Sequence, residues 1–188
     1  ASPVRLSSAL ASGATGIQVG SAFAFCEESG IESKIKSEVV DKGLKRALIV
    51  KTDFQASPTG YPFKLAEIEN TISDPEKYQD RRRVCDLGYL RQSYATEDGN
   101  IGFRCPGEPK ESFLRKGGRE SDTVGKVCLC NGLLSTIGLG QSRGESAEWP
   151  IVTAGVNFDF LNHVVTGSEP MYSARQVIDY LTEKEAVA

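Results

Sequence analysis

The sequence has only one histidine and no long hydrophobic run. No stretch approaches the roughly 18 to 20 apolar residues that a membrane-spanning helix needs. The first residues do not combine a basic stretch with an apolar core, so they do not resemble a secretory signal. We therefore expect a soluble, cytoplasmic protein with no membrane partner.

Neither the positive nor the negative side chains are concentrated in one part of the sequence. The 22 lysines and arginines are interspersed with 25 aspartates and glutamates, and the net charge is −3. This balance excludes the basic stripe of a nucleic-acid-binding protein. The local exception is the run from Arg81 to Arg83, between Asp80 and Asp86. The neighbouring acids favour a solvated loop or a local salt-bridge cluster, and phosphate binding is the alternative.

The five cysteines are an odd number and do not form the pattern of a secreted disulfide framework, so we expect reduced thiols. Four of them can in principle supply thiolates to a structural zinc ion: Cys85, Cys105, Cys128 and Cys130. Their spacing of 19, 22 and one intervening residues lacks the paired Cys-x2-Cys knuckles of such sites. No metal is therefore predicted, and a zinc site at these four cysteines remains the alternative.

The first quarter of the chain alternates helix and strand patterns. Ser2 and Pro3 are typical of a helix start, and an apolar stripe continues from there to Ser12. Residues 14–20 and 48–52 have strand patterns, and residues 31–47 have the spacing of a surface helix with one buried face. This order predicts an α/β fold.

After Thr52 prolines and glycines recur, so regular elements there must be short. We predict a brief helix at residues 63–70, a hairpin at 89–104 that turns on Asp98-Gly99, and a helix at 111–116. The apolar residues 126–141 should be buried, and Ser173 should cap a final helix. The predicted segments are therefore 1–52, the α/β part, and 53–188, a loop-rich extension.

The end of the first strand pattern, Val19-Gly20-Ser21, has the features of a phosphate site. Glycine lets the backbone approach a ligand, the first N–H groups of a following helix are unpaired, and Ser21 adds a hydroxyl donor. A small residue that only makes the turn is the competing interpretation.

The run GATGIQVGSAFAFCEESG, Gly13 to Gly30, resembles the nitronate monooxygenase (2-nitropropane dioxygenase) family of FMN-dependent enzymes. In that family this pattern is the eighth strand of a (β/α)8 TIM barrel, and its Gly-Thr/Ser backbone holds the FMN phosphate. The resemblance implies the C-terminal portion of such a barrel with an irregular, cysteine-containing extension. It also implies that FMN is the cofactor. The implied cofactor-binding residues are Gln18, Val19, Gly20 and Ser21.

The resemblance covers nearly the whole chain. Residues 51–64 fall where the family has a strand and loop near the flavin, although the loop here is longer and lacks the family's first arginine. The stretches RVCDLGYLR, GFRCPGEP, KVCLCNGLL and VTAGVNF are similar to the C-terminal extension of a longer subfamily.

The implied activity is FMN-dependent oxidation of alkyl nitronates, a small-molecule substrate, with O2. A flavin-dependent enoyl-ACP reductase shares the motif and is the nearest enzymatic alternative. No catalytic residue is assigned, because the family's general-base histidine precedes this segment. His163 matches no catalytic position and is expected to be structural.

A different class of function also remains open. One eighth-strand unit cannot close a parallel barrel, and an unpaired strand exposes its edges. The chain is then expected to need the missing N-terminal barrel segment as a partner, or to oligomerise. On this hypothesis it is a non-catalytic barrel segment by itself.

Overall fold

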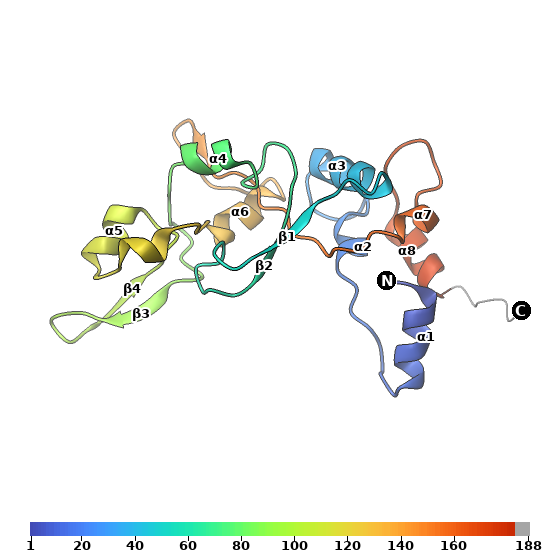
Figure 1. The fold of residues 1–188 in the computed structure, drawn as a ribbon, viewed down its shortest axis with the longest axis horizontal. Coiled ribbons are helices and arrows are strands. Elements are labelled where there is room, and N and C mark those ends of the chain that lie inside the picture. Colours follow the sequence, from blue (N-terminus) through green and yellow to red (C-terminus); the bar gives the residue numbers. More distant parts are fainter. Residues whose placement is uncertain (183–188) are drawn as a thin grey trace, which may run out of the picture. The chain divides into compact units, whose positions relative to one another are not determined.

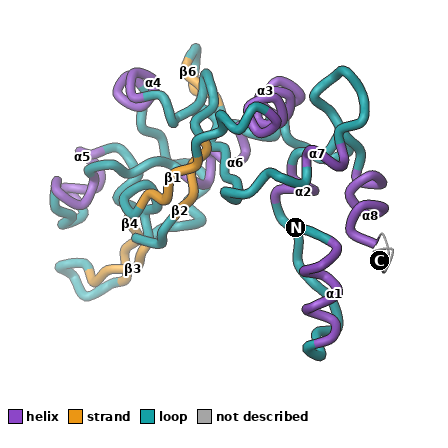
Figure 2. Tube along the Cα trace, turned by 45° about the vertical axis from the view of Figure 1, so that its right-hand side comes forward, coloured by secondary structure: helices purple, strands orange, loops and turns teal. Residues whose placement is uncertain are grey.

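The computed structural model describes residues 1–182, which divide into two compact units. The first unit combines Ala1–Ile49 with residues 154–182, and the second is Val50–Thr153. The regular elements of the protein are short helices and two-stranded antiparallel sheets, which Figure 1 and Figure 2 show. This mixture agrees with the predicted α/β class.

The two units differ from the predicted segments 1–52 and 53–188. One boundary lies close to the expected position, but residues 154–182 return to pack with the N-terminal residues. The reason is apolar burial: Phe158, Phe160 and Tyr172 become almost fully buried in the first unit.

The first unit is built from short helices. In chain order they are α1 (Pro3–Ala11), α2 (Ser21–Ala24), α3 (Ser33–Leu44), α7 (Leu161–Val164) and α8 (Ala174–Thr182). Ser2 caps α1 by accepting a hydrogen bond from the Arg5 amide, and Ser173 Oγ accepts one from the Gln176 amide at 3.2 Å. Both predicted caps are thus confirmed, since local hydrogen-bond chemistry is readable from sequence.

A row of aromatic rings forms the core of this unit. The ring centroids of Phe25 and Phe158 lie 6.1 Å apart, and those of Phe158 and Phe160 lie 5.9 Å apart. Tyr172 meets Phe160 edge to face at 5.9 Å, and its hydroxyl donates to the Ala22 carbonyl at 2.8 Å. This hydrogen bond satisfies the polar end of a side chain that is only 1% exposed.

Helix α3 confirms the helix predicted at residues 31–47, and it packs against α7. Ile35, Val39 and Val40 are buried on the inner side of the helix. At Gly43 the two helices approach so closely that a Cβ atom would lie 2.6 Å from Leu161 Cδ1. Gly43 is therefore required by packing and not by backbone conformation.

We predict that Gly43→Ala destabilises the first unit. Alanine gains about 1 kcal/mol of helix propensity over glycine, but overpacking a close contact costs about 1–3 kcal/mol. The net effect should be a lower midpoint of thermal unfolding, measured by circular dichroism. Lys34→Ala on the exposed side of α3 is the control and should change stability little. A Gly43→Ala chain more stable than wild type would contradict the close packing.

The strand predicted at residues 14–20 is wrong. These residues form no strand ladder with any described residue. Six of the seven residues are exposed, with Val19 half-buried. A strand needs a neighbouring strand to accept and donate its hydrogen bonds, and the sequence pattern does not show whether one is present.

The second unit contains three two-stranded antiparallel sheets and four short helices. The sheets are β1 (Val50–Asp53) with β2 (Phe63–Ala66), β3 (Gln92–Ala95) with β4 (Ile101–Arg104), and β5 (Ser142–Arg143) with β6 (Ser146–Ala147). The helices are α4 (Pro75–Asp80), α5 (Lys110–Arg115), the 3-10 helix η1 (Glu120–Thr123) and α6 (Leu129–Ser135). No described strand pairs in parallel, so a barrel is not formed by residues 1–182.

The helix predicted at residues 63–70 is wrong, because residues 63–66 pair as β2 with β1. Along β2, Phe63 and Leu65 are half-buried while Lys64 is exposed, which is the period-2 pattern of a strand. By contrast, the hairpin on Asp98-Gly99 is confirmed, with the Thr96 amide donating to the Asn100 carbonyl at 2.9 Å. The helix predicted at 111–116 is confirmed as α5.

The predicted burial of residues 126–141 holds only for part of the stretch. Val127 and Leu129 join a small core with Ala56, Ile72 and Ile151. Leu133, Ile137 and Leu139 are exposed. One face of α6 is thus buried, as a short amphipathic helix requires.

The second unit contains a buried ion pair between residues that are far apart in the sequence. Arg81 Nη1 donates to the two Glu148 carboxylate oxygens at 3.2 and 3.3 Å, and both side chains are 2% exposed.

Arg81 Nη2 donates to the Lys126 carbonyl at 2.9 Å, and Arg83 donates to the carbonyls of Pro106 and Thr123. Burial raises the pKa of Glu148 although Arg81 opposes the shift. The arginine run thus acts structurally through partners distant in sequence.

We predict that Glu148→Ala lowers the free energy of unfolding by about 3–5 kcal/mol, because it leaves the buried Arg81 charge without a partner. The double variant Arg81→Met/Glu148→Leu should be close to wild type, since both desolvation costs disappear. Chemical denaturation of the wild type, Arg81→Met, Glu148→Leu and the double variant measures the coupling. A mild effect of Glu148→Ala, below about 1 kcal/mol, would show that the pair is not sealed from water.

Candidate functional site

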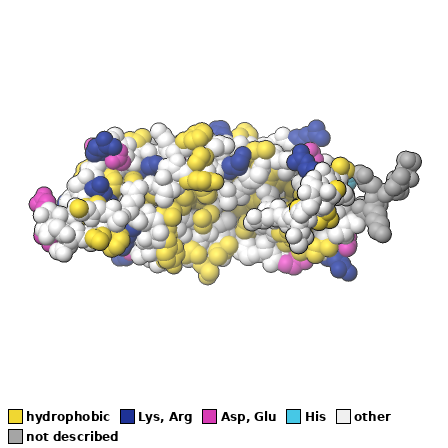
Figure 3. All heavy atoms as spheres, turned by 90° about the horizontal axis from the view of Figure 1, so that it is seen from below, with side chains coloured by type: hydrophobic (Ala, Val, Ile, Leu, Met, Phe, Trp, Pro, Cys, Tyr) yellow, Lys and Arg dark blue, Asp and Glu magenta, His cyan; other side chains and the backbone are white. Residues whose placement is uncertain are grey.

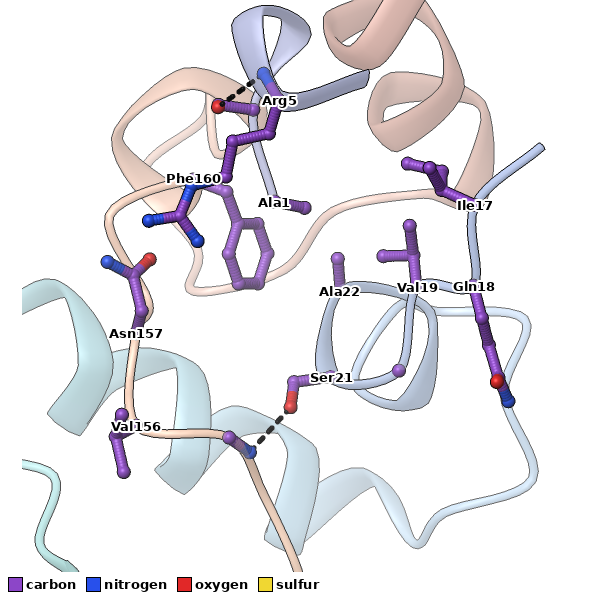
Figure 4. Close-up of a pocket in the computed structure, with 13 residues that line it drawn as sticks. Ala1, Arg5, Ile17, Gln18, Val19, Ser21, Ala22, Val156, Asn157 and Phe160 are labelled. Carbon is purple, nitrogen blue, oxygen red and sulfur yellow. Dashed lines mark hydrogen bonds between the residues drawn. The ribbon is translucent and has the colours of Figure 1, made fainter. Parts of the chain in front are cut away.

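A pocket of about 400 Å³ lies in the first unit. Its lining comes from the start of α1, from residues 17–22, from the loop at 155–157 and from Phe160. The four residues predicted to bind a cofactor, Gln18 to Ser21, all line it. Figure 4 shows Ser21, Ala22 and Val19 on one side, with Arg5, Asn157 and Phe160 across the pocket.

Gly20 and Ser21 make the turn into α2 at the edge of this pocket. Gly20 is the N-cap residue, with φ −91° and ψ −84°, and no atom lies within 4 Å of where its Cβ would be. Open space at this position leaves the backbone accessible to a ligand. The amides of Phe23 and Ala24 both donate to the Gly20 carbonyl at 3.0 Å. The amides of Ser21 and Ala22, at the start of α2, have no intrahelical acceptor.

The Ser21 side chain also has a structural role. Its Oγ accepts a hydrogen bond from the Gly155 amide at 2.8 Å, which joins residues 134 positions apart. Figure 4 marks this contact with a dashed line. The loop at 155–157 is thereby held at the pocket wall.

The electrostatics of the pocket favour an anion. Arg5 is the only charged side chain that lines it within the described residues. In Figure 4 the Arg5 guanidinium extends from α1 toward Phe160 and Asn157. Ile17, Val19, Val156 and Phe160 add apolar surface. The arrangement can therefore hold a molecule with an anionic end and an apolar part.

The four residues predicted to bind a cofactor do not contribute equally to the pocket. Gly20 and Ser21 offer backbone at the helix start, while the Gln18 side chain is exposed and extends away from Arg5 in Figure 4. Arg5 and the 155–157 loop were missed by sequence reasoning. Arg5 lies on a helix predicted only from its apolar stripe, and the loop reaches the site only through tertiary packing.

The residues present fit the phosphate end of FMN. The fit rests on the open Gly20 position, the helix-start donors and the Arg5 cation. The volume lies within the range of small-molecule sites, which is about 300–1,000 Å³.

Ser21→Ala is predicted to destabilise the first unit by about 1 kcal/mol, because the Gly155 amide loses its acceptor. Native-state hydrogen exchange should show faster exchange at Gly155, and thermal unfolding should shift down. Ser29→Ala is the matched control, because the buried Ser29 hydroxyl has no hydrogen-bond partner. Removal of that hydroxyl should be neutral or slightly stabilising. Equal effects of the two variants would contradict the prediction that the hydrogen bond from Gly155 to Ser21 stabilises the loop at 155–157.

The four cysteines of the alternative zinc site lie in the second unit. Cys105 and Cys128 are buried, while Cys85 and Cys130 are half-buried, and all are free thiols. Among residues 1–182 no group of three or more histidine, cysteine, aspartate or glutamate side chains is arranged to hold a metal ion. Burial raises the pKa of Cys128 to about 11, so this thiol is neutral at pH 7.

His163 is exposed and stacks on the Tyr180 ring, with the centroids 4.7 Å apart. It does not line the pocket that contains Gly20. The ring contact gives His163 a packing role between α7 and α8.

On the face of the molecule in Figure 3, basic and acidic side chains are scattered among hydrophobic and uncharged ones. This agrees with the mixed charge of the sequence. None of the helices among residues 1–182 is long and apolar enough to cross a membrane.

Comparison with known proteins found no matching family model, no matching curated protein and no matching solved structure.

Proposed function

We propose that this chain carries the phosphate-binding turn of an FMN-dependent oxidoreductase similar to the nitronate monooxygenases. The observation that carries the proposal is the pocket in which the Gly20-Ser21 helix start meets Arg5. An exposed backbone turn and a cation are complementary to a phosphate group. The family resemblance of residues 13–30 then selects FMN among phosphate-containing ligands.

The residues of the chain take separate roles in this proposal. The backbone at Gly20 and Ser21 and the Arg5 guanidinium bind the phosphate. Phe160 and Val19 exclude water beside the apolar part of the ligand. Bound flavin supplies the redox chemistry, oxidation of an alkyl nitronate with O2. No residue of this chain is assigned as the catalytic base.

The TIM-barrel architecture is part of the same proposal. Residues 14–20 are mostly exposed and form no strand ladder with any described residue, so residues 16–19 can pair with a strand of another segment. The partner is the N-terminal barrel segment of the same family, and self-association is the alternative. The free thiols are in keeping with a cytoplasmic location.

The test is a fluorescence titration of the 188-residue chain with FMN and, separately, with riboflavin, which lacks the phosphate. FMN should bind and riboflavin should bind at least about tenfold more weakly, a difference of about 1.4 kcal/mol. Gly20→Ala should weaken FMN binding by a similar factor, because a methyl group occupies the open space beside the turn. The φ of Gly20 is negative, so alanine there is not placed in the left-handed region.

Gly16→Ala is the matched control. Gly16 lies four residues earlier, also has open space at its Cβ position and does not line the pocket. This variant should bind FMN as wild type does. Equal binding of FMN and riboflavin, or equal effects of the two glycine variants, would refute the phosphate turn. If FMN binds, reduction by NAD(P)H in place of turnover of a nitronate would indicate the enoyl-ACP reductase class.

A further inference from the structure

A second pocket, of about 300 Å³, lies in the second unit and shares no residue with the pocket at Gly20. We call it the basic pocket, because five cationic side chains and only two carboxylates line it. The cations are Arg82, Arg83, Arg91, Lys116 and Arg143, and the carboxylates are Asp86 and Glu108. The lining therefore carries three more positive charges than negative ones.

Both carboxylates are already paired with a cation of the same lining. The two Glu108 oxygens accept hydrogen bonds from Lys116 Nζ at 3.0 and 2.9 Å, and Glu108 is only 2% exposed. Asp86 forms an ion pair with Arg143. The excess positive charge of the basic pocket thus resides on the three remaining arginines.

These three arginines have no carboxylate partner. Among residues 1–182, Arg82, Arg83 and Arg91 form no ion pair. Arg83 instead donates to the carbonyls of Pro106 and Thr123 at 3.2 and 2.9 Å. Carbonyl acceptors hold a guanidinium in place but do not neutralise its charge, and the group keeps N–H donors for a ligand.

The turn before β3 holds Arg91 in the same way. Its Nη2 donates to the Cys85 carbonyl at 3.0 Å. The guanidinium lies close to Gly88, where a Cβ would come within 2.8 Å of it. A cation that is already positioned loses little side-chain entropy when an anion binds.

Arg82 has no partner at all within the described part of the chain. It is exposed, and it makes no hydrogen bond, ion pair or ring contact with residues 1–182. All five N–H donors of its guanidinium are therefore available at the pocket. The arginine run is thus divided in its roles: Arg81 is buried against Glu148, whereas Arg82 and Arg83 line the basic pocket.

The rest of the lining favours a small, compact ligand. It consists of Val84, Cys85, Pro109 and Ser112, and no aromatic ring lines the pocket within the described residues. A flavin or a nucleobase would therefore find no ring to stack on. Guanidinium groups match the oxygens of phosphate in bidentate hydrogen bonds, and three of them at one pocket favour a dianion.

We propose that the basic pocket binds the phosphate group of a small ligand, either inorganic phosphate or a phosphomonoester, through Arg82, Arg83 and Arg91. The excess positive charge, the two internally paired carboxylates and the unpartnered Arg82 guanidinium carry this inference. The site is separate from the proposed FMN site, which lies in the first unit.

Isothermal titration calorimetry of the 188-residue chain in a chloride buffer at pH 7 tests the proposal, with inorganic phosphate as the probe. One phosphate should bind per chain, with a dissociation constant below about 1 mM. Arg82→Gln should weaken binding by about tenfold, because a charge-assisted partner of the anion is lost while no contact within residues 1–182 is broken. Arg82→Lys keeps the charge and should weaken binding less.

Arg115→Gln is the matched control. Arg115 is also an exposed arginine of the second unit, forms no ion pair within residues 1–182 and does not line the basic pocket. Its replacement changes the net charge of the chain equally and should leave phosphate binding unchanged. Equal weakening by Arg82→Gln and Arg115→Gln would show a non-specific charge effect and overturn the site.

Glycerol 3-phosphate and malonate identify the chemistry of the ligand. Glycerol 3-phosphate that binds more tightly than inorganic phosphate assigns the pocket to a phosphomonoester, and weaker binding assigns it to free phosphate. Malonate, a dicarboxylate, should bind more weakly than phosphate because its charge is divided between two separate groups. Malonate that binds as tightly as phosphate, or a phosphate dissociation constant above about 1 mM, would overturn the proposal. These titrations contain no flavin, so their failure would leave the FMN proposal unaffected.

Discussion

The burial of Tyr172 against the row of Phe160, Phe158 and Phe25 is the interaction on which the first unit depends. The helices of this unit are short, and α2 and α7 have only four residues each. Helices of this length are not stable by themselves in water. Their stability comes from apolar area that is buried when residues 154–182 pack onto residues 1–49, with α8 in contact with α1, α2 and α7.

The pocket at Gly20 is a consequence of that packing. Phe160 belongs both to the aromatic row and to the pocket wall, and Ser21 is tied to the loop at 155–157 through Gly155. The same contacts that stabilise the unit therefore set the geometry of the candidate site. The second unit has a smaller apolar core and uses buried charge and long-range arginine–carbonyl hydrogen bonds between its loops.

Features that depend on neighbours in sequence were predictable. The caps at Ser2 and Ser173, the turn at Asp98-Gly99 and the helix α3 follow from side-chain hydrogen bonds, positive φ at glycine and apolar spacing. The predictions for residues 14–20 and 63–70 failed because a strand forms only where a second strand pairs with it, and the partner strand cannot be read from the local sequence pattern. In the first case the described residues supply no partner strand, and in the second β1 does.

Helix α3, the two helix caps, the Asp98-Gly99 hairpin and the mixed charge could be predicted from the sequence, because each depends on residues within a few positions of one another. Tertiary packing was needed to bring Arg5 and the loop at 155–157 into one pocket with the Gly20-Ser21 turn, and to pair Arg81 with Glu148. These contacts join residues from 67 to more than 130 positions apart, and burial of apolar surface within each unit selects them.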